Sequence, residues 1–179
     1  MSDSAVRVDR AELTDAAELS KVAAATFPMA CPPTTTPENM AVFIAEMLSE
    51  DRFRDYLTDP SRVVLKAVRD GQIVGYALLN SGEPTHPAVA HVITERPVTE
   101  LSKLYVLPGF HGDGVSAALM SEAVATARST GSVAMWLAVN QENVRAQRFY
   151  GKQGFARVGI KDFMVGTQLH HDYVMQLRC

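Results

Sequence analysis

Apolar residues recur along the chain at two spacings, which predict helices and strands around one sheet. Spacings of three and four residues, typical of a helix with one buried face, mark segments 15–26, 37–48, 115–131 and 141–153. Alternating or continuous apolar runs, typical of strands, mark segments 6–8, 62–68, 72–79, 99–107, 133–139, 156–160 and 173–177. This order of helices and strands predicts an α+β domain around one mixed sheet.

Turn and capping residues set the predicted boundaries of these elements. Asp70-Gly71 separates two apolar runs and indicates a hairpin, because a tight hairpin turn needs positive φ angles. Asn140 is predicted to cap the last helix, and Gly154 to end it. Segment 27–36 carries three prolines and is predicted to be a loop, and segment 81–97 is predicted to be a long surface loop.

Composition narrows the class of protein. The 179 residues are predicted to form one domain, 1–179, and 47% of them are hydrophobic, enough for a sizeable core. The net charge of −3, with scattered basic residues, argues against a nucleic-acid partner. The apolar run 133–139 is too short to span a bilayer, and the first residues lack the layout of a signal peptide. With Cys31 and Cys179 as the two cysteines, we expect a reducing, cytoplasmic location.

A glycine-rich turn follows the apolar strand 99–107 and precedes a helix. Gly109, Gly112 and Gly114 remove side chains that would keep a ligand away from the backbone. The helix start adds free N–H groups and a partial positive charge, so the turn predicts a phosphate site. A dinucleotide site is a weaker prediction, because its fingerprint belongs to an early strand–turn–helix unit. The alternative is that the glycines only satisfy the geometry of the turn.

The helix after Asn140 carries a second candidate group. Asn143, Ala146 and Tyr150 lie at positions i, i+3 and i+7 and therefore share one helix face. A tyrosine hydroxyl keeps its proton at neutral pH and can donate it to a departing thiolate. The alternative is that Tyr150 packs its ring in the core with its hydroxyl satisfied.

Together these features resemble the GCN5-related N-acetyltransferase (GNAT) superfamily. The family's cofactor loop is Arg/Gln-x-x-Gly-x-Gly/Ala, and segment 111–116 aligns with it through Gly114, with His111 in place of Arg or Gln and Ser116 in place of Gly or Ala. Segments 105–108 and 118–119 also match, as do Asn140, Asn143, Ala146, Phe149, Tyr150, Gly154 and Phe155. The resemblance implies a three-layer α/β/α domain around a mixed, mostly antiparallel sheet, with acetyl-CoA as cosubstrate.

The resemblance also implies roles for individual residues. Backbone groups of the strand would pair with the pantetheine arm, and backbone N–H groups of the loop and helix start would hold the pyrophosphate. Asn143 would contact the pantetheine, and Tyr150 would bind the cosubstrate and protonate the CoA thiolate. The implied cofactor-binding residues are Leu104, Tyr105, Val106, His111, Gly112, Asp113, Gly114, Val115, Ser116, Ala117, Asn143 and Tyr150.

The predicted reaction is acetyl transfer to a primary amine, small molecule or polyamine, by direct attack. Glu100, on the strand that leads to the acetyl group, is the candidate general base through a water, although it is equally an ordinary surface carboxylate. Segments 26–28, 43–49, 70–76, 163–166 and 172–175 resemble short motifs of PaiA-type polyamine acetyltransferases. Glu46, Glu50 and Asp51 are candidates to attract a polycation, and segments 27–50 and 81–97 are expected to cover the acceptor side.

Other functions stay open at this point. A non-catalytic acyl-CoA sensor is one alternative, because His111 departs from the family's cofactor loop. A partner-binding module and an acetyltransferase of protein N-termini or lysines are two others, because both would have the same fold. His170-His171 lacks a matching ligand set, so we predict no metal and place this pair in a surface turn. The sequence leaves the oligomeric state undetermined, with a homodimer as one option.

Overall fold

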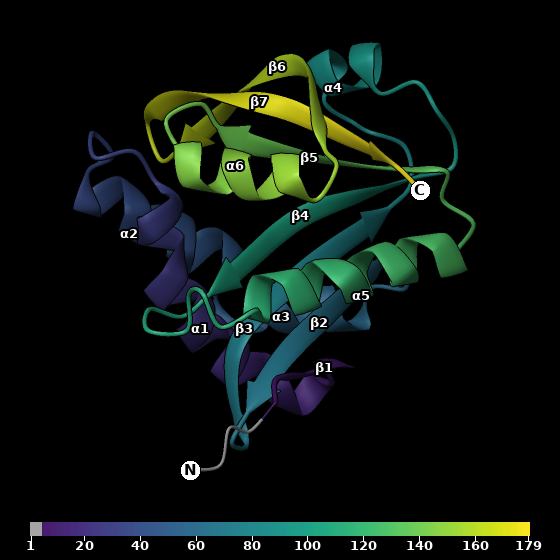
Figure 1. Ribbon diagram of the computed structural model, residues 1–179. Coiled ribbons are helices and arrows are strands. Elements are labelled where there is room, and N and C mark those ends of the chain that lie inside the picture. The colour runs from purple at the N-terminus through teal and green to yellow at the C-terminus, as the bar shows by residue number, and fades with distance from the viewer. Residues whose placement is uncertain (1–4) are drawn as a thin grey trace.

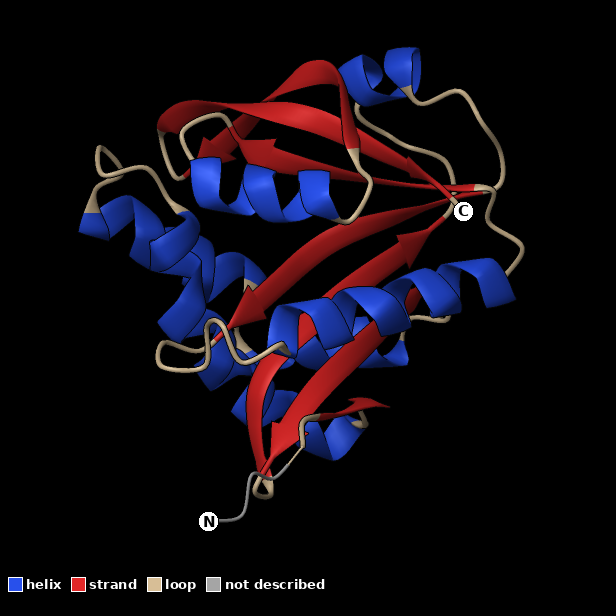
Figure 2. Cartoon of the chain, in the orientation of Figure 1, coloured by secondary structure: helices blue, strands red, loops and turns tan. Residues whose placement is uncertain are grey.

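One seven-stranded sheet runs through residues 5–179, the part of the chain that the computed structural model describes (Figures 1 and 2). Its strand order is β1-β2-β3-β4-β5-β7-β6. Neighbouring strands are antiparallel except for β4 and β5, so the predicted mixed, mostly antiparallel sheet is confirmed. The strands are β1 (Arg7–Arg10), β2 (Arg62–Arg69), β3 (Gln72–Ser81), β4 (Val98–Val106), β5 (Ala134–Asn140), β6 (Ala156–Val165) and β7 (Gln168–Arg178).

Helices cover both faces of the sheet. They are η1 (Leu13–Asp15), α1 (Ala16–Ala30), α2 (Pro37–Met47), α3 (Glu50–Thr58), α4 (Pro87–Val92), α5 (Val115–Ser129) and α6 (Val144–Lys152). Helices α1 and α3 pack behind β2, β3 and β4 in the view of Figure 1, α2 packs on α1 and β6, and α5 lies in front of β2, β3 and β4. The result is the three-layer α/β/α arrangement that the resemblance implies.

The alternation of side chains along the strands supplies both hydrophobic cores. Leu79 and Leu104 join the buried face of α5 in one core, whereas Tyr76 and Leu78 join α1 and α3 in the other. Because β3 is buried on both faces, it reads as a nearly continuous apolar run. A third, smaller cluster beneath α4 contains Trp136.

The parallel strands β4 and β5 pair over only three residues. Val98 to Glu100 lie opposite Ala134 to Trp136, and beyond this point the two strands part (Figure 1). β5 then continues along β7 as far as Asn140, and β4 continues along β3 as far as Val106. Within the described residues, the β5-facing edge of β4 therefore has no strand partner after Glu100, and its backbone groups face the space between the strands.

A bulge in β4 changes which side chains share a face. Lys103 lies opposite Leu78 and Leu101 opposite Leu79, so Ser102 is the extra residue. In a regular strand, residues 100 and 103 would point to opposite faces. The bulge places Lys103 on the same face as Glu100, toward α1 and α2.

Several predicted boundaries are wrong. Helix α6 begins at Val144 with Asn143 as its cap, because Asn140 remains the last residue of β5. Segment 81–97 is not all loop: His86 caps α4, which packs on β6. Helix α1 extends to Ala30, into the expected loop, and β6 and β7 form a long hairpin with a turn at Gly166.

Among residues 5–179, no helix has the length and hydrophobicity that crossing a membrane requires.

Candidate active site

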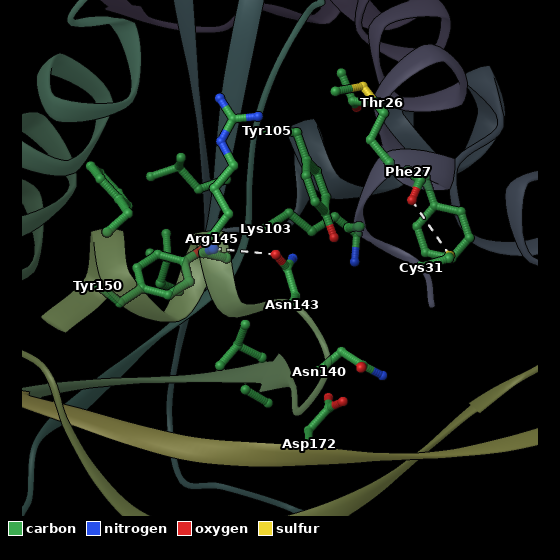
Figure 3. Close-up of a pocket in the computed structure, with 18 of the residues that line it drawn as sticks. Thr26, Phe27, Cys31, Lys103, Tyr105, Asn140, Asn143, Arg145, Tyr150 and Asp172 are labelled. Carbon is green, nitrogen blue, oxygen red and sulfur yellow. Dashed lines mark hydrogen bonds between the residues drawn. The ribbon is translucent and has the colours of Figure 1, made fainter. Parts of the chain in front are cut away.

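A cavity of about 540 Å³ lies where β4 and β5 part. Its walls come from α1 and α2 on one side, from the start of α5 and from α6 on another, and from the β6–β7 hairpin opposite β4 (Figure 3). A concave space of this size is typical of a small-molecule site. The cavity has two parts, one beside the glycine turn and one beneath α1 and α2.

The glycine turn forms the first part of the cavity. Gly112 and Gly114 have φ angles of 87° and 78°, in the left-handed region that favours glycine, and an added Cβ at either position would meet open space. Gly114 caps α5, whose first turn carries no acidic residue. The first N–H groups of this 15-residue helix therefore lie at the cavity with no carboxylate in the first turn. The turn and the helix start therefore present backbone to the cavity, and the phosphate cradle stays a prediction.

The predicted cofactor residues do not all reach this space. Leu104, Tyr105, Val106, His111, Gly112, Gly114, Ser116, Ala117, Asn143 and Tyr150 line the cavity. The Asp113 carboxylate instead accepts a hydrogen bond from Arg69 Nη1 at 3.0 Å, outside the cavity. The side chain of Val115 is buried in the core. At these two positions only the backbone is available to a ligand.

His111 and Arg145 face the cavity beside the glycine turn. Burial lowers the pKa of His111, and the positive charge of Arg145 lowers it further, so the imidazole is neutral at pH 7. Its Nε2 is buried and has no hydrogen-bond partner among the described residues. Arg145, the second residue of α6, points its guanidinium away from β5 and β7 (Figure 3) and makes no ion pair in the described part of the chain. Arg145, which the sequence reasoning missed, is the cation of this part of the cavity.

Tyr150 and Asn143 reach the cavity from α6. The Tyr150 ring packs on Phe149 and Phe155, with centroids 5.5 and 6.0 Å away, while its hydroxyl has no hydrogen-bond partner among residues 5–179. Burial raises the pKa of Tyr150 to about 12. Asn143 Oδ1 accepts a hydrogen bond from the Ala146 N–H at 3.2 Å and so caps α6. The phenol thus keeps its proton at neutral pH and presents it to the cavity.

Glu100 lies at the point where β4 and β5 stop pairing. Its Oε1 accepts a hydrogen bond from Asn80 Nδ2 at 2.8 Å, and the side chain is half-buried at the floor of the cavity. The carboxylate is therefore held in place by the neighbouring strand β3 and still borders the space between the strands.

The second part of the cavity contains two charged residues, Lys103 and Asp172, that the sequence reasoning did not identify. Asp172 on β7 is 6% exposed, its Oδ1 has no partner among the described residues, and burial raises its pKa to about 6. Burial also lowers the pKa of Lys103 to about 8. Phe27 stacks on Phe43 at 4.4 Å and forms an apolar wall. These residues come from distant parts of the chain, so no local sequence motif predicts that they lie together.

Three expectations about the acceptor side are wrong or incomplete. Phe27, Cys31 and Phe43 from segment 27–50 do line the cavity, but no residue of segment 81–97 does. Glu50 and Asp51 form ion pairs with Arg54 on the surface of α3, and Glu46 also lies outside the cavity. His170 is in strand β7, not in a surface turn, and is 3.2 Å from the Thr35 hydroxyl. No group of three metal-ligating side chains occurs within residues 5–179.

The fold places a helix N-terminus at the gap between two parting strands, and comparison with known proteins identifies the class of protein. The model of the acetyltransferase (GNAT) family matches residues 25–155, and the chain belongs to this family. It is an acyltransferase, and acetyl-CoA is its cosubstrate.

Individual relatives support the same conclusion. The chain is 52% identical over 163 residues to an uncharacterized N-acetyltransferase of Mycobacterium bovis, covering 91% of this chain and 97% of that protein. It is 27% identical over 122 residues to the streptothricin acetyltransferase of Streptomyces lavendulae, covering 66% and 59%. The PaiA N-acetyltransferase of Thermoplasma acidophilum, solved in complex with coenzyme A, has the same fold, with a TM-score of 0.77 at 18% identity over 98% and 99% of the two chains.

Proposed function

We propose that this N-acetyltransferase moves the acetyl group to a primary amine of a small molecule by direct attack, with Tyr150 as the general acid. The observation that carries the proposal is the Tyr150 hydroxyl, which is unpaired among the described residues and borders the cavity at the parting of β4 and β5. Its partners in the cavity are a fixed carboxylate, Glu100, and the free edge of β4.

The proposed reaction forms a C–N bond and breaks a C–S bond. The neutral amine attacks the thioester carbonyl, and the oxyanion accepts a hydrogen bond from a backbone N–H near Val106. As the C–S bond breaks, Tyr150 gives its proton to the sulfur. Burial raises the pKa of Tyr150 to about 12, and the same burial raises the basicity of the departing thiolate, so the two remain matched. Glu100 takes the surplus proton of the amine through a water.

The same proposal assigns the binding of acetyl-CoA. The N–H groups from Gly112 to Ala117 hold the pyrophosphate, because Gly114 begins α5, the first turn of α5 carries no acidic residue, and the Asp113 carboxylate is paired with Arg69. Neutral His111 offers a hydrogen bond instead of the charge of the family's Arg, and Arg145 supplies positive charge from the opposite wall. The free edge of β4, residues 104–106, and Asn143 hold the pantetheine arm.

The small-molecule acceptor is favoured over a polyamine by the charges of the site. Glu50 and Asp51, the residues expected to attract a polycation, are already paired with Arg54 and lie outside the cavity. A long polycation would also have to pass Lys103 and Lys161, which line the acceptor side. The resemblance to PaiA concerns the fold and does not decide the acceptor.

The Tyr150→Phe variant tests the proposal. We expect kcat, measured as release of CoA thiol with an amine panel, to fall by about 10²- to 10⁴-fold, the range typical of a lost general acid. Calorimetric titration with acetyl-CoA, with plain CoA as the comparison, is expected to change by less than about threefold, because only one hydroxyl is removed. Tyr173→Phe is the matched control, since Tyr173 lies outside the cavity, against Arg157. An unchanged kcat in Tyr150→Phe removes Tyr150 from the acid role.

A further inference from the structure

Two lysines from different strands meet at the acceptor side of the cavity. Lys103 comes from β4 and Lys161 from β6, and both are half-buried and line the space beneath α1 and α2. Neither forms an ion pair with any residue in the described part of the chain. Lysines are seldom withdrawn from water without a partner, because burial disfavours the charged form. Glu100 acts on Lys103 and Asp172 on Lys161 without forming an ion pair, so both ammonium groups keep their hydrogen-bond donors for the anionic group of a ligand.

The fold places both lysines there for identifiable reasons. The bulge at Ser102 turns Lys103 toward α1 and α2, where its Nζ lies 6.0 Å from the centroid of the Phe43 ring. Lys161 Nζ lies 5.7 Å from the Phe163 ring, which meets Phe43 edge to face at 5.6 Å. Each ammonium group therefore lies over one ring of this aromatic pair. The positive charge of Lys161 also lowers the pKa of Lys103, so each senses the other.

Carboxylates complete the charge pattern of this side of the cavity. Asp172 lies directly across the strand ladder from Lys161, yet the two form no ion pair, and Asp172 Oδ1 has no hydrogen-bond partner among the described residues. Glu100, held by Asn80, lies three residues before Lys103 on the same face of the sheet. The cavity thus offers two cationic and two anionic groups to one ligand, a pattern complementary to a molecule that carries both charges.

We infer that the acceptor is an amine that also carries an anionic group, a carboxylate or a phosphate, which Lys103 and Lys161 bind while the amine faces Glu100 and Asp172. The inference rests on the proposed function, because it names the substrate class of the same site. A polycation would meet two like charges, and a neutral amine would leave both ammonium groups without a partner. The phenylalanine wall supplies contact for the apolar part of such a molecule.

Matched pairs of amines test the inference through CoA-thiol release. The pairs are phenylalanine and phenethylamine, 4-aminobutyrate and butylamine, and phosphoethanolamine and ethanolamine, with spermidine as the polycation. In the pair that turns over fastest, we expect kcat/KM of the anionic member to exceed that of its partner by about tenfold or more, the effect of one charge-assisted hydrogen bond. Whether the amino acids or the phosphate ester lead distinguishes carboxylate from phosphate. Faster acetylation of spermidine or of the neutral partners overturns the inference.

Variants assign the discrimination to the two lysines. Lys103→Met and Lys161→Met, which keep an extended side chain against the phenylalanine rings, are expected to reduce the anionic preference to within about threefold of unity. Lys21→Met, at an exposed position of α1 outside the cavity, is the control and should keep the preference. Acetyl-CoA affinity should stay within about threefold in both variants. A large loss of that affinity would instead assign the lysines to the cosubstrate and overturn the inference.

Product binding separates a failure of this inference from a failure of the proposed function. The CoA complex of the wild-type protein is titrated calorimetrically with N-acetylphenylalanine and with N-acetylphenethylamine, which requires no turnover. Tighter binding of the anionic product supports the anion site, even if no amine is acetylated and the proposed reaction is lost. Turnover of neutral amines without this preference retains the reaction and removes the anion site. Equal binding of both products, or no binding of either, also overturns the inference.

Discussion

Asp172 gives a test of the site that needs no substrate. Its carboxyl is 6% exposed and has an oxygen without a partner in the described part of the chain, so the charged form is poorly solvated. Burial raises the pKa of Asp172 from 3.8 to about 6, although the positive charges of Lys161 and His171 act in the opposite direction. We predict that Asp172→Asn stabilises the protein at neutral pH and not at acid pH.

The expected size follows from the difference in pKa between the folded and unfolded states. At about 1.36 kcal/mol per pH unit, a rise from 3.8 to about 6 corresponds to about 3 kcal/mol. Between these two pH values the folded carboxyl binds more protons than the unfolded one, so the free energy of unfolding falls as the pH rises and levels off above about pH 6. Asparagine does not titrate, so the gain in Asp172→Asn should grow from near zero below pH 4 to about 3 kcal/mol above pH 7.

Urea unfolding at a series of pH values measures this gain. Trp136, the only tryptophan in the sequence, is 5% exposed in β5 and reports unfolding by its fluorescence. Asp55→Asn is the matched control, because Asp55 is exposed on α3, where its charge remains solvated. Equal stability of Asp172→Asn and wild type at pH 7.5, or a gain that is the same at pH 4.5, would refute the reasoning. A gain in stability together with a loss of acetyl transfer would show that the charge is kept for function.

Two further predictions concern the binding of acetyl-CoA and the position of β4. Arg145→Met should weaken acetyl-CoA binding about tenfold and flatten its salt dependence, because the variant lacks the cation proposed to face the phosphates. Arg148→Met is the control, because Arg148 lies outside the cavity. Equal effects of the two variants in calorimetry would contradict the role of Arg145. Gly75→Ala should destabilise the protein by about 1–3 kcal/mol, since the new Cβ would lie 2.8 Å from the Tyr105 carbonyl oxygen. Gly151→Ala, which meets no atom within 4 Å, should be neutral or stabilising, and similar urea midpoints for the two variants would exclude the clash.

The cofactor side of the site was readable from the sequence because its parts are close together in the chain. A buried strand, a glycine turn and a helix start follow one another between residues 98 and 117, and each has a local signal. Tyr150 stands out for the same reason, because it lies seven residues after Asn143 on one helix face. The start of α6 was misplaced because Asn140 and Asn143 are both good caps. The choice between them depends on β7, which holds Asn140 in the sheet.

The acceptor side could not be read in this way because four distant elements build it. Lys103 lies on the acceptor side because of a bulge in the pairing of β3 with β4. The local sequence around Ser102 does not indicate that β4 has one residue more than β3 at this point. Asp172 and Lys161 lie on the β6–β7 hairpin, whose strands were predicted too short. Exposed apolar residues such as Ile160 and Leu169 interrupt the alternation of apolar and polar residues by which strands are recognised. The nature of the acceptor is therefore a property of the tertiary structure.

The short pairing of β4 with β5 links the two sides. Because the parallel ladder ends at Glu100, the edge of β4 beyond it is free for the pantetheine arm, and the gap opens toward both the glycine turn and the β6–β7 hairpin. Glu100 occupies the point from which both sides are reached, with Asn80 fixing its carboxylate. A longer ladder would pair this edge of β4 with β5 and take its backbone groups away from a ligand. The interruption of the sheet thus creates the space that the glycine turn, Tyr150 and the two lysines share.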